Sequence, residues 1–294
     1  GYLLKKTMGG IAVKVLRALL MFGLCFLILQ PILNKISISF MTEADLYDST
    51  VVILPRHVTT LNYQLTSYLM NYPTSLLNTF LISLSTAVLQ VAACTLVGYG
   101  FARYEFPLKK FWFACVILVI IIPPQTIATS LHLNFRFFDI FGIFKATTGN
   151  TLNLRKSITP YLMMSMTCMG LKDGLYIFML RQYFRGVPKS LEEAAYVDGC
   201  GTLHTFARVM LPDALPILTS CFLFAFVWQW TDFFYSTTFM SSASLLSNQL
   251  STLTIKLSRY LNDTSNTAGS AVGLARSQQI TATGVLMTTV PLII

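Results

Sequence analysis

Long apolar runs alternate with shorter polar stretches along the chain. An α-helix needs about 20 mostly apolar residues to cross the hydrocarbon core of a bilayer. Six runs have this character, and they cover residues 18–33, 76–102, 111–133, 159–180, 214–235 and 277–294. Lys172 and Asp173 interrupt the fourth run, which makes it the weakest of the six. The pattern predicts an all-α, polytopic membrane protein with six transmembrane helices.

The composition excludes several classes of soluble protein. Hydrophobic residues make up 54% of the chain and charged residues 11%, with a mean hydropathy of +0.62, whereas soluble domains carry roughly 25% charged residues. An ordinary soluble enzyme, a disordered chain and a nucleic-acid-binding protein all need more charge. We attribute the net charge of +9 to Lys and Arg at cytoplasmic helix ends, which fix the orientation of membrane proteins.

The distribution of positive charge favours a cytosolic N-terminus. This orientation places residues 1–17, 103–110 and 181–212 in the cytosol, with four, three and four Lys and Arg residues. The outer loops hold nine over nearly twice the length, so the bias has the expected sign. These polar outer loops are open to two interpretations, a surface that binds a partner or solvated connections.

The first and last apolar runs lie near the two ends of the chain. The first run is expected to be a retained span, because no small-residue cleavage pattern follows it. The chain opens at Gly1 and stops at Ile294 within an apolar run, so we expect both ends to be trimmed and the last span to be truncated. We divide the chain into an N-terminal segment, 1–75, and a membrane core, 76–294.

Five of the six cysteines lie in apolar runs and Cys200 in the cytosol, which predicts no disulfide framework.

The cytosolic stretch 181–212 carries the most specific pattern. Pro188 ends the incoming helix, and Ser190 followed by Glu193 forms a capping box that predicts a helix over 191–198. Gly199 can adopt the positive φ that terminates this helix. Four residues share one face of it, and its two alanines allow close approach of another backbone: Leu191, Ala194, Ala195 and Asp198.

A second short helical stretch, 202–210, leads to Leu211 and Pro212, and Pro212 suits the first turn of the fifth span. The series Glu193-Ala194-Ala195, three residues, Gly199, nine residues, Val209-Met210-Leu211-Pro212 resembles the EAA loop of binding-protein-dependent ABC importer permeases. Cys200 and Val209 depart from the usual residues of that family by small changes. The resemblance implies a cytosolic coupling helix, between spans four and five, that docks into a cleft of an ATPase subunit. The implied coupling residues are Glu192, Glu193, Ala194, Ala195, Asp198, Gly199, Leu211 and Pro212.

Three further stretches extend the resemblance to the shorter permease of the maltose and multiple-sugar class. They are residues 98–107, Pro123-Pro124-Gln125 and 228–233. The resemblance implies a bacterial or archaeal cell-membrane permease that pairs with a homologous second permease and two ATPase subunits. The ATPase subunits would bind ATP and Mg, so this chain needs no cofactor and is no enzyme. An extracellular solute-binding protein would deliver the sugar or oligosaccharide.

Candidate residues for a sugar pathway combine aromatic faces with amide and charged groups. They are Pro124, Gln125, Lys172, Asp173, Trp228, Gln229, Trp230, Asp232 and Tyr235. Each group has a plain structural alternative. The two tryptophans and Asp232 also suit interface anchors and a helix-end charge, and the Lys172-Asp173 pair also suits a position just outside a helix that begins at Gly174. Pro123 and Pro124 require a bend, which is either a hinge or a static kink.

Several chemical motifs are absent from the sequence. It has no G-x-x-x-x-G-K-[ST] phosphate loop, no H-E-x-x-H zinc pair and no Gly-x-Ser-x-Gly nucleophile elbow, so we predict no metal site and no catalytic residue. One alternative is an ATP-independent secondary transporter or channel, which needs intramembrane charge relays or inverted repeats. Another is an ABC importer for a non-sugar solute, such as glycerol phosphate or a peptide.

Overall fold

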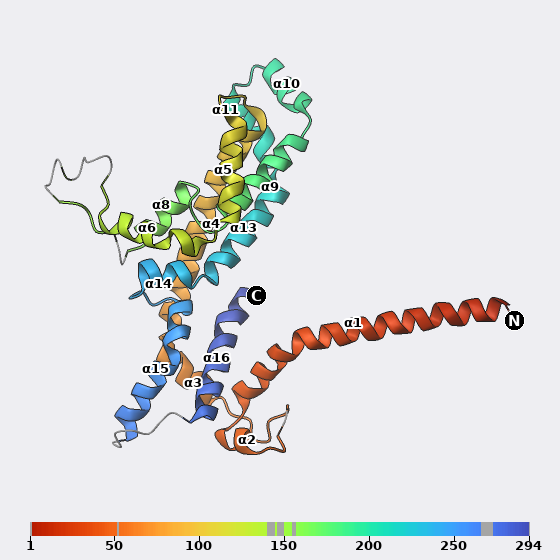
Figure 1. The fold of residues 1–294 in the computed structure, drawn as a ribbon, viewed down its shortest axis with the longest axis vertical. Helices are drawn as coiled ribbons and strands as arrows, with labels where there is room; N and C mark the ends of the chain where they lie inside the picture. The colour runs from red at the N-terminus through yellow and green to blue at the C-terminus, as the bar shows by residue number, and fades with distance from the viewer. Residues whose placement is uncertain are drawn as a thin grey trace. The chain divides into compact units, whose positions relative to one another are not determined.

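A computed structural model describes residues 2–51, 53–139, 145, 150–154, 157–265 and 273–293. Within these ranges the chain is mostly helical and has no strand, apart from an isolated bridge between Phe138 and Leu152. It divides into two compact units (Figure 1). Unit 1 comprises residues 1–72 and 249–294, and unit 2 comprises residues 73–248. The all-α class predicted from the sequence is confirmed.

Unit 1 brings the first helices together with the last. It contains α1 (Tyr2–Phe40), α2 (Glu43–Tyr47), α3 (Leu61–Met70), α16 (Leu274–Ile293) and most of α15 (Leu246–Ser265). Helix α16 packs against α1 and α3. Buried amides fix the end of α1, because Asn62 Nδ2 donates to the carbonyls of Ser39 and Met41, and Gln279 Nε2 also donates to Met41.

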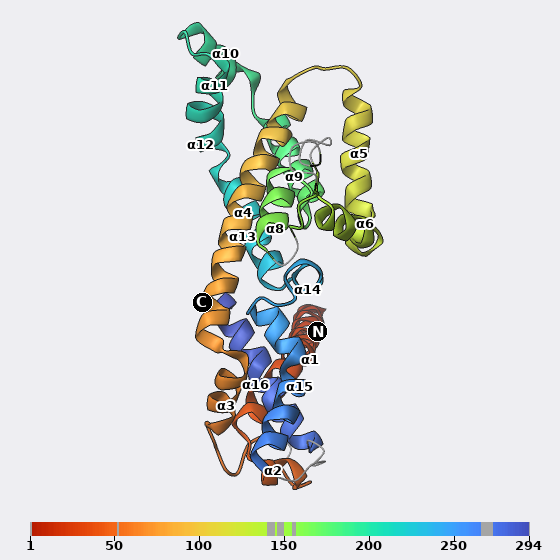
Figure 2. The same cartoon turned by 90° about the vertical axis from the view of Figure 1, so that its left-hand side faces the viewer.

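Unit 2 contains almost all of α4 and the helices that follow it (Figures 1 and 2). These are α4 (Tyr72–Arg103), α5 (Lys109–Ile121), α6 (Pro124–Arg136), α8 (Thr159–Met166), α9 (Asp173–Gly186), α10 (Lys189–Val197), α11 (Thr202–Thr205), the π-helix η1 (Phe206–Met210), α12 (Leu211–Asp213), α13 (Leu215–Trp230) and α14 (Phe234–Met240). Its main core joins α4, α9 and α13, with Tyr176, Leu180 and Phe184 of α9 completely buried.

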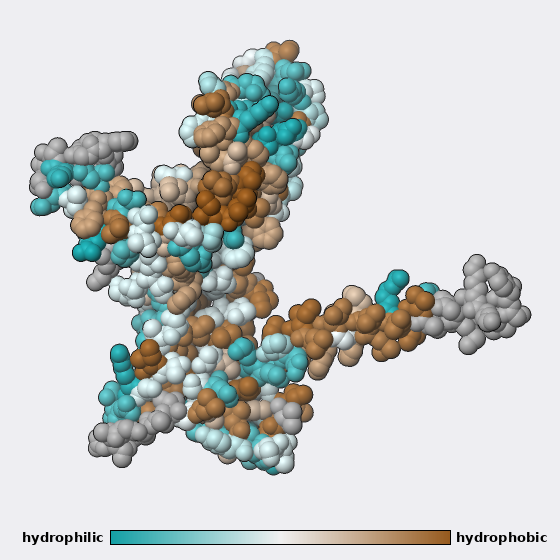
Figure 3. Space-filling view, viewed as in Figure 1, coloured by the Kyte–Doolittle hydropathy of each residue, from teal (hydrophilic) through white to brown (hydrophobic). Residues whose placement is uncertain are grey.

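Two helices among the described residues are long and apolar enough to cross a membrane unaided. They are Val13–Phe40, whose apolar side chains are exposed along α1 (Figure 3), and Tyr72–Arg103. The number rises to four if each bent pair is one span. Helices α5 and α6 meet at 103°, and Thr202–Asp213 meets α13 at 76°.

Two expected breaks are present where the sequence placed them. The chain bends between α5 and α6 at Pro123 and Pro124, because proline lacks an amide donor and clashes with the preceding helical turn. The fourth apolar run is divided into α8 and α9, with Lys172 in the left-handed region at φ +66°. Each half is shorter than a membrane span.

Gly98 lies where α4 approaches α9 most closely. A Cβ atom on Gly98 would lie 2.9 Å from the Leu180 Cβ and 3.2 Å from the Arg181 backbone nitrogen. Neither atom is the end of a flexible side chain, so a larger residue requires the two helices to separate. Gly100 lies two residues further along the same helix and has open space around it.

Replacing Gly98 by alanine should therefore destabilise the protein, whereas Gly100→Ala should not. Overpacking of this kind costs about 1–3 kcal/mol, while alanine in an open helical position gains roughly 0.5–1 kcal/mol over glycine. Thermal unfolding of the detergent-purified protein should give a lower midpoint for Gly98→Ala than for Gly100→Ala. Equal midpoints would contradict the close packing of α4 on α9.

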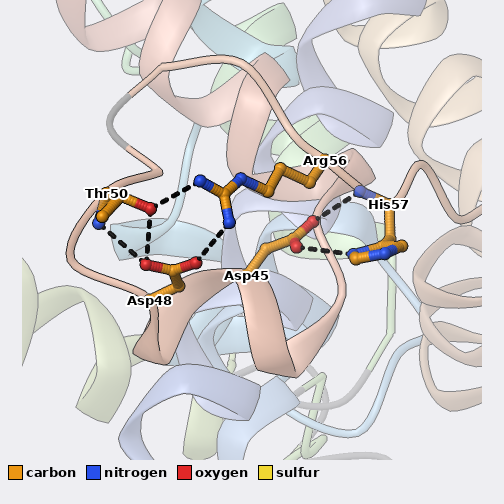
Figure 4. A network of polar contacts seen from close by, with 5 residues as sticks. All are labelled: Asp45, Asp48, Thr50, Arg56 and His57. Carbon is orange, nitrogen blue, oxygen red and sulfur yellow. Dashed lines mark hydrogen bonds and ion pairs between the residues drawn. The ribbon is translucent and has the colours of Figure 1, made fainter.

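A polar network closes the loop after α2 in unit 1 (Figure 4). The Asp45 carboxylate accepts the backbone N–H of His57 at 3.0 Å, and its other oxygen lies 3.0 Å from His57 Nδ1. Asp48 accepts the Thr50 amide at 2.9 Å and pairs with Arg56 at 2.9 Å. These hydrogen bonds hold the pKa of both carboxyl groups below the ordinary value of 3.8, chiefly through His57 for Asp45 and Thr50 for Asp48.

This network should resist mild acid and open only in strong acid. A carboxyl with a lowered pKa contributes stability above its ordinary pKa, and loses it as the pH falls through the folded pKa. Hydrogen exchange, corrected for intrinsic pH dependence, should show the His57 and Thr50 amides equally protected at pH 7 and pH 5, and deprotected below pH 3.8. Asp45→Asn should weaken protection at His57 and leave Thr50 unchanged. Loss of protection between pH 7 and pH 5 would contradict control of the loop by these two carboxyl groups.

Candidate functional site

Helix α10 begins two residues earlier than the sequence predicted. It spans Lys189–Val197, with Pro188 as the residue before its first turn, and no side chain caps its start. The capping box of Ser190 and Glu193 is therefore wrong, because Ser190 already lies inside the helix. The extended backbone of Pro188, at φ −58° and ψ 135°, ends the preceding segment and lets the helix start at once.

The end of α10 matches the prediction for Gly199. This residue has φ +80°, its amide donates to the Tyr196 carbonyl at 3.0 Å, and the Cys200 amide donates to the Ala195 carbonyl at 2.9 Å. The two bonds form a Schellman motif, which satisfies the last carbonyls of a helix. A side chain at position 199 would be strained in this conformation.

Helix α10 turns one narrow face toward the rest of the chain and leaves most of the predicted docking face exposed. Glu192 and Ala195 are buried, whereas Leu191, Ala194 and Asp198 are exposed. The sequence did not indicate that Glu192 is buried, because its buried partners lie on α4, far away in the chain. The exposed side of α10 includes Glu193 and Val197, and Val197 is 87% exposed. Leu203 of the following helix α11 is also apolar and is 82% exposed.

Glu192 joins α10 to the end of α4. The Tyr99 hydroxyl donates to Glu192 Oε1 at 2.8 Å, and Arg103 Nε lies 3.2 Å from the same oxygen. Arg103 Nη2 also donates to the Val187 carbonyl at 2.8 Å, just before α10. Tyr99 and Arg103 are four residues apart and so share a face of α4. They lie in the stretch 98–107 that carries the family resemblance, but the sequence pattern gave no indication of their contact with Glu192.

Aromatic packing surrounds this network. The Tyr99 ring lies 5.3 Å from the Phe184 ring of α9 and 4.7 Å from the Phe206 ring of η1. One tyrosine therefore touches the helices on both sides of the loop that contains α10. The side chains of Arg103 and Glu192 are 6% and 11% exposed, so their charges are largely removed from solvent.

Leu211 and Pro212 occupy a different place from the one predicted. Pro212 lies in the first turn of the three-residue α12, and the long helix α13 begins at Leu215 with Pro216 in its first turn. The expectation that Pro212 opens the fifth span is wrong, because a 76° bend at Ala214 separates the two helices. The Tyr183 hydroxyl of α9 donates to the Asp213 carbonyl at 2.5 Å and so ties α12 to α9.

The Lys172-Asp173 pair lies at the start of α9. Asp173 is the first residue of the helix and is 1% exposed; its carboxylate accepts Gln90 Nε2 at 2.8 Å and the Gly170 amide at 2.5 Å. The Lys172 ammonium lies 5.0 Å from the centre of the Trp228 ring. The two neighbouring side chains therefore point in different directions. The Asp173 carboxylate is inside the protein, and the Lys172 ammonium lies against the Trp228 ring.

The remaining pathway candidates fall into separate environments. Trp228 is 46% exposed, whereas Gln229, Trp230 and Tyr235 are buried. Asp232 accepts the Tyr161 hydroxyl at 2.8 Å and the Ser236 amide at 2.9 Å at the start of α14, as a helix-end charge does. Pro124 and Gln125 form the first turn of α6, and within the described ranges no hydrogen bond or ring contact links them to Lys172 or Trp228.

Potential metal ligands do not gather in the part of the chain that the structure describes. Those ranges contain no group of three His, Cys, Asp or Glu side chains suited to a metal ion. All six cysteines are free, and the Cys94 and Cys168 sulfur atoms lie 4.0 Å apart.

Residues 94–294 match the family described as the binding-protein-dependent transport system inner membrane component. A probable ABC transporter permease of Pyrococcus horikoshii is 30% identical over 165 residues, which is 56% of this chain and 54% of that protein. The arabinooligosaccharides transport system permease AraQ of Halalkalibacterium halodurans is 26% identical over 92% of this chain and 86% of its own length. A solved bacterial ABC transporter that imports the acidic polysaccharide alginate superposes with a TM-score of 0.66 at 19% identity, over 95% of this chain and 92% of that one.

The chain belongs to the binding-protein-dependent transport system inner membrane component family. This family comprises inner-membrane components of binding-protein-dependent transport systems, and the two relatives above are named as permeases. The match covers about half the length of the Pyrococcus protein and of the osmoprotective compounds uptake permease GgtD of Synechocystis. The alginate transporter supports the fold alone.

The Tyr99 hydroxyl should stabilise the protein only through Glu192. Tyr99→Phe removes a hydrogen bond to a buried carboxylate, which should cost about 1.5–3 kcal/mol and lower the thermal midpoint of the purified protein. The same substitution in a Glu192→Met background should have almost no effect, because the acceptor is gone. Tyr104→Phe, at a 44% exposed tyrosine, is the matched control and should leave the midpoint unchanged. Additive effects of Tyr99→Phe and Glu192→Met would contradict the contact.

Proposed function

We propose that this chain is a transmembrane permease subunit of an ATP-driven importer that moves a sugar or oligosaccharide into the cytosol. Family membership supports the importer class. The observation that carries the mechanism is α10, a nine-residue helix at the end of unit 2 (Figures 1 and 2), anchored by Glu192 and bearing exposed apolar side chains. Such a helix is too short to be stable alone, and its outer surface suits a groove on a partner.

The partner of α10 in this proposal is an ATPase subunit. Glu193, Ala194 and Asp198 lie on its exposed part, and Leu191 and Val197 add apolar area that a cleft would bury. ATP and Mg would bind to the ATPase. When two ATPase subunits close, displacement of α10 would pass to α4 through Tyr99 and Arg103, and to α9 through the Tyr183 contact with α12.

The finer architecture follows the same proposal. Six spans would arise from α1, α4, α5 with α6, α8 with α9, α13 and α16, with the N-terminus and α10 in the cytosol. A homologous second permease would complete the pathway, and an extracellular binding protein would deliver the solute. The positive charges near the end of α4, the start of α5 and α10 support this orientation.

A carbohydrate is the solute that the relatives favour. Several relatives are named as transporters of arabinooligosaccharides, trehalose, alpha-glucosides or maltodextrin. In this chain the partly exposed Trp228 ring with the Lys172 ammonium 5.0 Å away offers an aromatic face beside a hydrogen-bond donor. Asp173, Asp232 and Trp230 are buried, so in the proposal they support the pathway rather than line it.

Co-purification from the native membrane in mild detergent tests the importer. The tagged full-length chain should recover one homologous permease and two copies of an ATPase, identified and counted by mass spectrometry. Recovery of the chain alone, or as a homo-oligomer, under conditions that preserve other membrane complexes would favour an ATP-independent transporter instead.

A substitution that adds a charge to α10 distinguishes a role in ATPase binding from a role in assembly of the two permeases. Val197→Arg should reduce ATPase recovery at least tenfold while the second permease stays bound, because a charge would be placed in an apolar contact. Leu54→Arg, at an 81% exposed apolar residue in the loop after α2, is the matched control and should leave recovery unchanged. Unchanged ATPase recovery with Val197→Arg would contradict docking through α10.

A further inference from the structure

A strongly cationic pocket lies at one end of unit 2. Its volume is about 490 Å³, and it opens where α4 ends and where α5 and α10 begin. Glu105 is the one carboxylate among its lining residues, against six cations. The six are Arg103, Lys109, Lys110, Arg181, Arg185 and Lys189.

Most of this positive charge is not neutralised within the described chain. Arg103 pairs with Glu192, and Lys109 lies 2.9 Å from Glu105. The other four cations have no carboxylate within ion-pair distance among the residues that the structure describes. Positive charges gathered around one cavity repel one another, so an anion inside it lowers the electrostatic energy.

Arg181 is held in a fixed orientation at the wall of the pocket. Its guanidinium carbon lies 3.7 Å from the centre of the Phe113 ring. Its Nε is buried and has no hydrogen-bond partner in the described part of the chain. A stacked guanidinium presents a rigid set of N–H donors, which matches the oxygens of a phosphate.

Two helix starts add to the positive potential. Lys109 is the first residue of the 13-residue α5 and Lys189 the first of α10, and no side chain caps either start. The helix dipole favours an anion at such positions. The pocket therefore combines lysines, a stacked arginine and two helix N-termini, and each of these groups favours a bound anion.

The surface next to the pocket indicates where the anion comes from. No residue of α5 is buried, and Phe111, Trp112 and Ile121 are 57%, 51% and 71% exposed. Figure 3 shows this helix as a brown, apolar surface beside the teal end of the unit. Trp near a helix end is typical of the membrane interface, so the pocket lies at the depth of lipid headgroups.

We propose that this pocket binds the phosphate-bearing headgroup of an anionic phospholipid, whose acyl chains lie along α5. Basic pockets between transmembrane helices bind such headgroups. The site is separate from the exposed face of α10 and from Lys172 and Trp228. Lipid binding at this pocket does not depend on which solute the importer carries.

Lipid binding to the purified complex tests the proposal. Delipidated complex is titrated with phosphatidylglycerol or phosphatidylcholine, and bound lipid is read by native mass spectrometry and by the shift of the thermal midpoint. Wild type should bind phosphatidylglycerol at least tenfold more tightly than phosphatidylcholine. The double variant Lys110→Gln/Arg181→Gln should lose at least tenfold in affinity for phosphatidylglycerol.

The matched control removes the same charge elsewhere. Lys14→Gln/Arg17→Gln, at two exposed positions of α1 in unit 1, should bind phosphatidylglycerol like wild type. If Arg181→Gln impairs folding, Lys110→Gln/Lys189→Gln replaces it, because both lysines are exposed. Arg181→Lys keeps the charge and should retain part of the affinity.

Four results would overturn the proposal. Equal affinity for both lipids, or equal loss in the control variant, would mean that no specific anion site exists. Inorganic phosphate that raises the thermal midpoint as much as phosphatidylglycerol, with the same loss in the pocket variant, would assign the site to a free phosphate. Binding to the isolated chain but not to the complex would mean that a partner subunit covers the pocket.

Discussion

The architecture of unit 2 depends on one face of α4 that is lined by small and polar residues. At intervals of three or four residues this face carries Ser75, Thr79, Ser83, Thr86, Gln90, Cys94 and Gly98, and all of them are buried. Within a membrane, apolar surface gives little preference for helix over lipid, so close packing and hydrogen bonds hold helices together. Ser75 bonds Ser244, Thr79 accepts the Leu246 amide, and Gln90 donates to Asp173. The same helix thus fixes the segment before α15 and the start of α9.

Gln90 explains how the chain can break between α8 and α9. A break exposes backbone groups that are costly without partners in an apolar environment. Gln90 Nε2 donates both to the Leu171 carbonyl, at 3.1 Å, and to Asp173, whose carboxylate in turn accepts the Gly170 amide. The Asp173 carboxylate therefore helps to satisfy the backbone of this turn. Its neighbour Lys172 is left to point its ammonium at Trp228.

Periodicity, proline and glycine signals predicted much of this structure. The apolar runs located α1, α4 and α13, the two prolines located the bend after α5, and Gly199 located the end of α10, because each is a local effect. The start of α10 and its buried face were missed, since they depend on Tyr99 and Arg103, over 80 residues earlier in the chain. A local pattern treats Glu192 as a first-turn acid, and only the partners from α4 make it a buried residue. The sequence also did not show that the pathway candidates lie in separate environments. Asp232 and Asp173, for example, accept hydrogen bonds from nearby backbone amides instead of lining a shared pathway.

Helix α10 illustrates how a short helix can be both fixed and available to a partner. Nine residues are too few for stability in water, and the Schellman motif at Gly199 secures only one end. The other end is held by Glu192 against two groups of α4, and Ala195 gives the only other buried contact on the described helix. Both buried residues lie on one narrow face, which leaves Leu191, Tyr196 and Val197 exposed. Because the anchor is a hydrogen-bonded ion pair rather than a broad apolar contact, a force on α10 would, in the proposed mechanism, act on the last turn of α4. The side chain that receives it, Arg103, also lines the cationic pocket, so the same residue joins the proposed ATPase contact to the membrane surface.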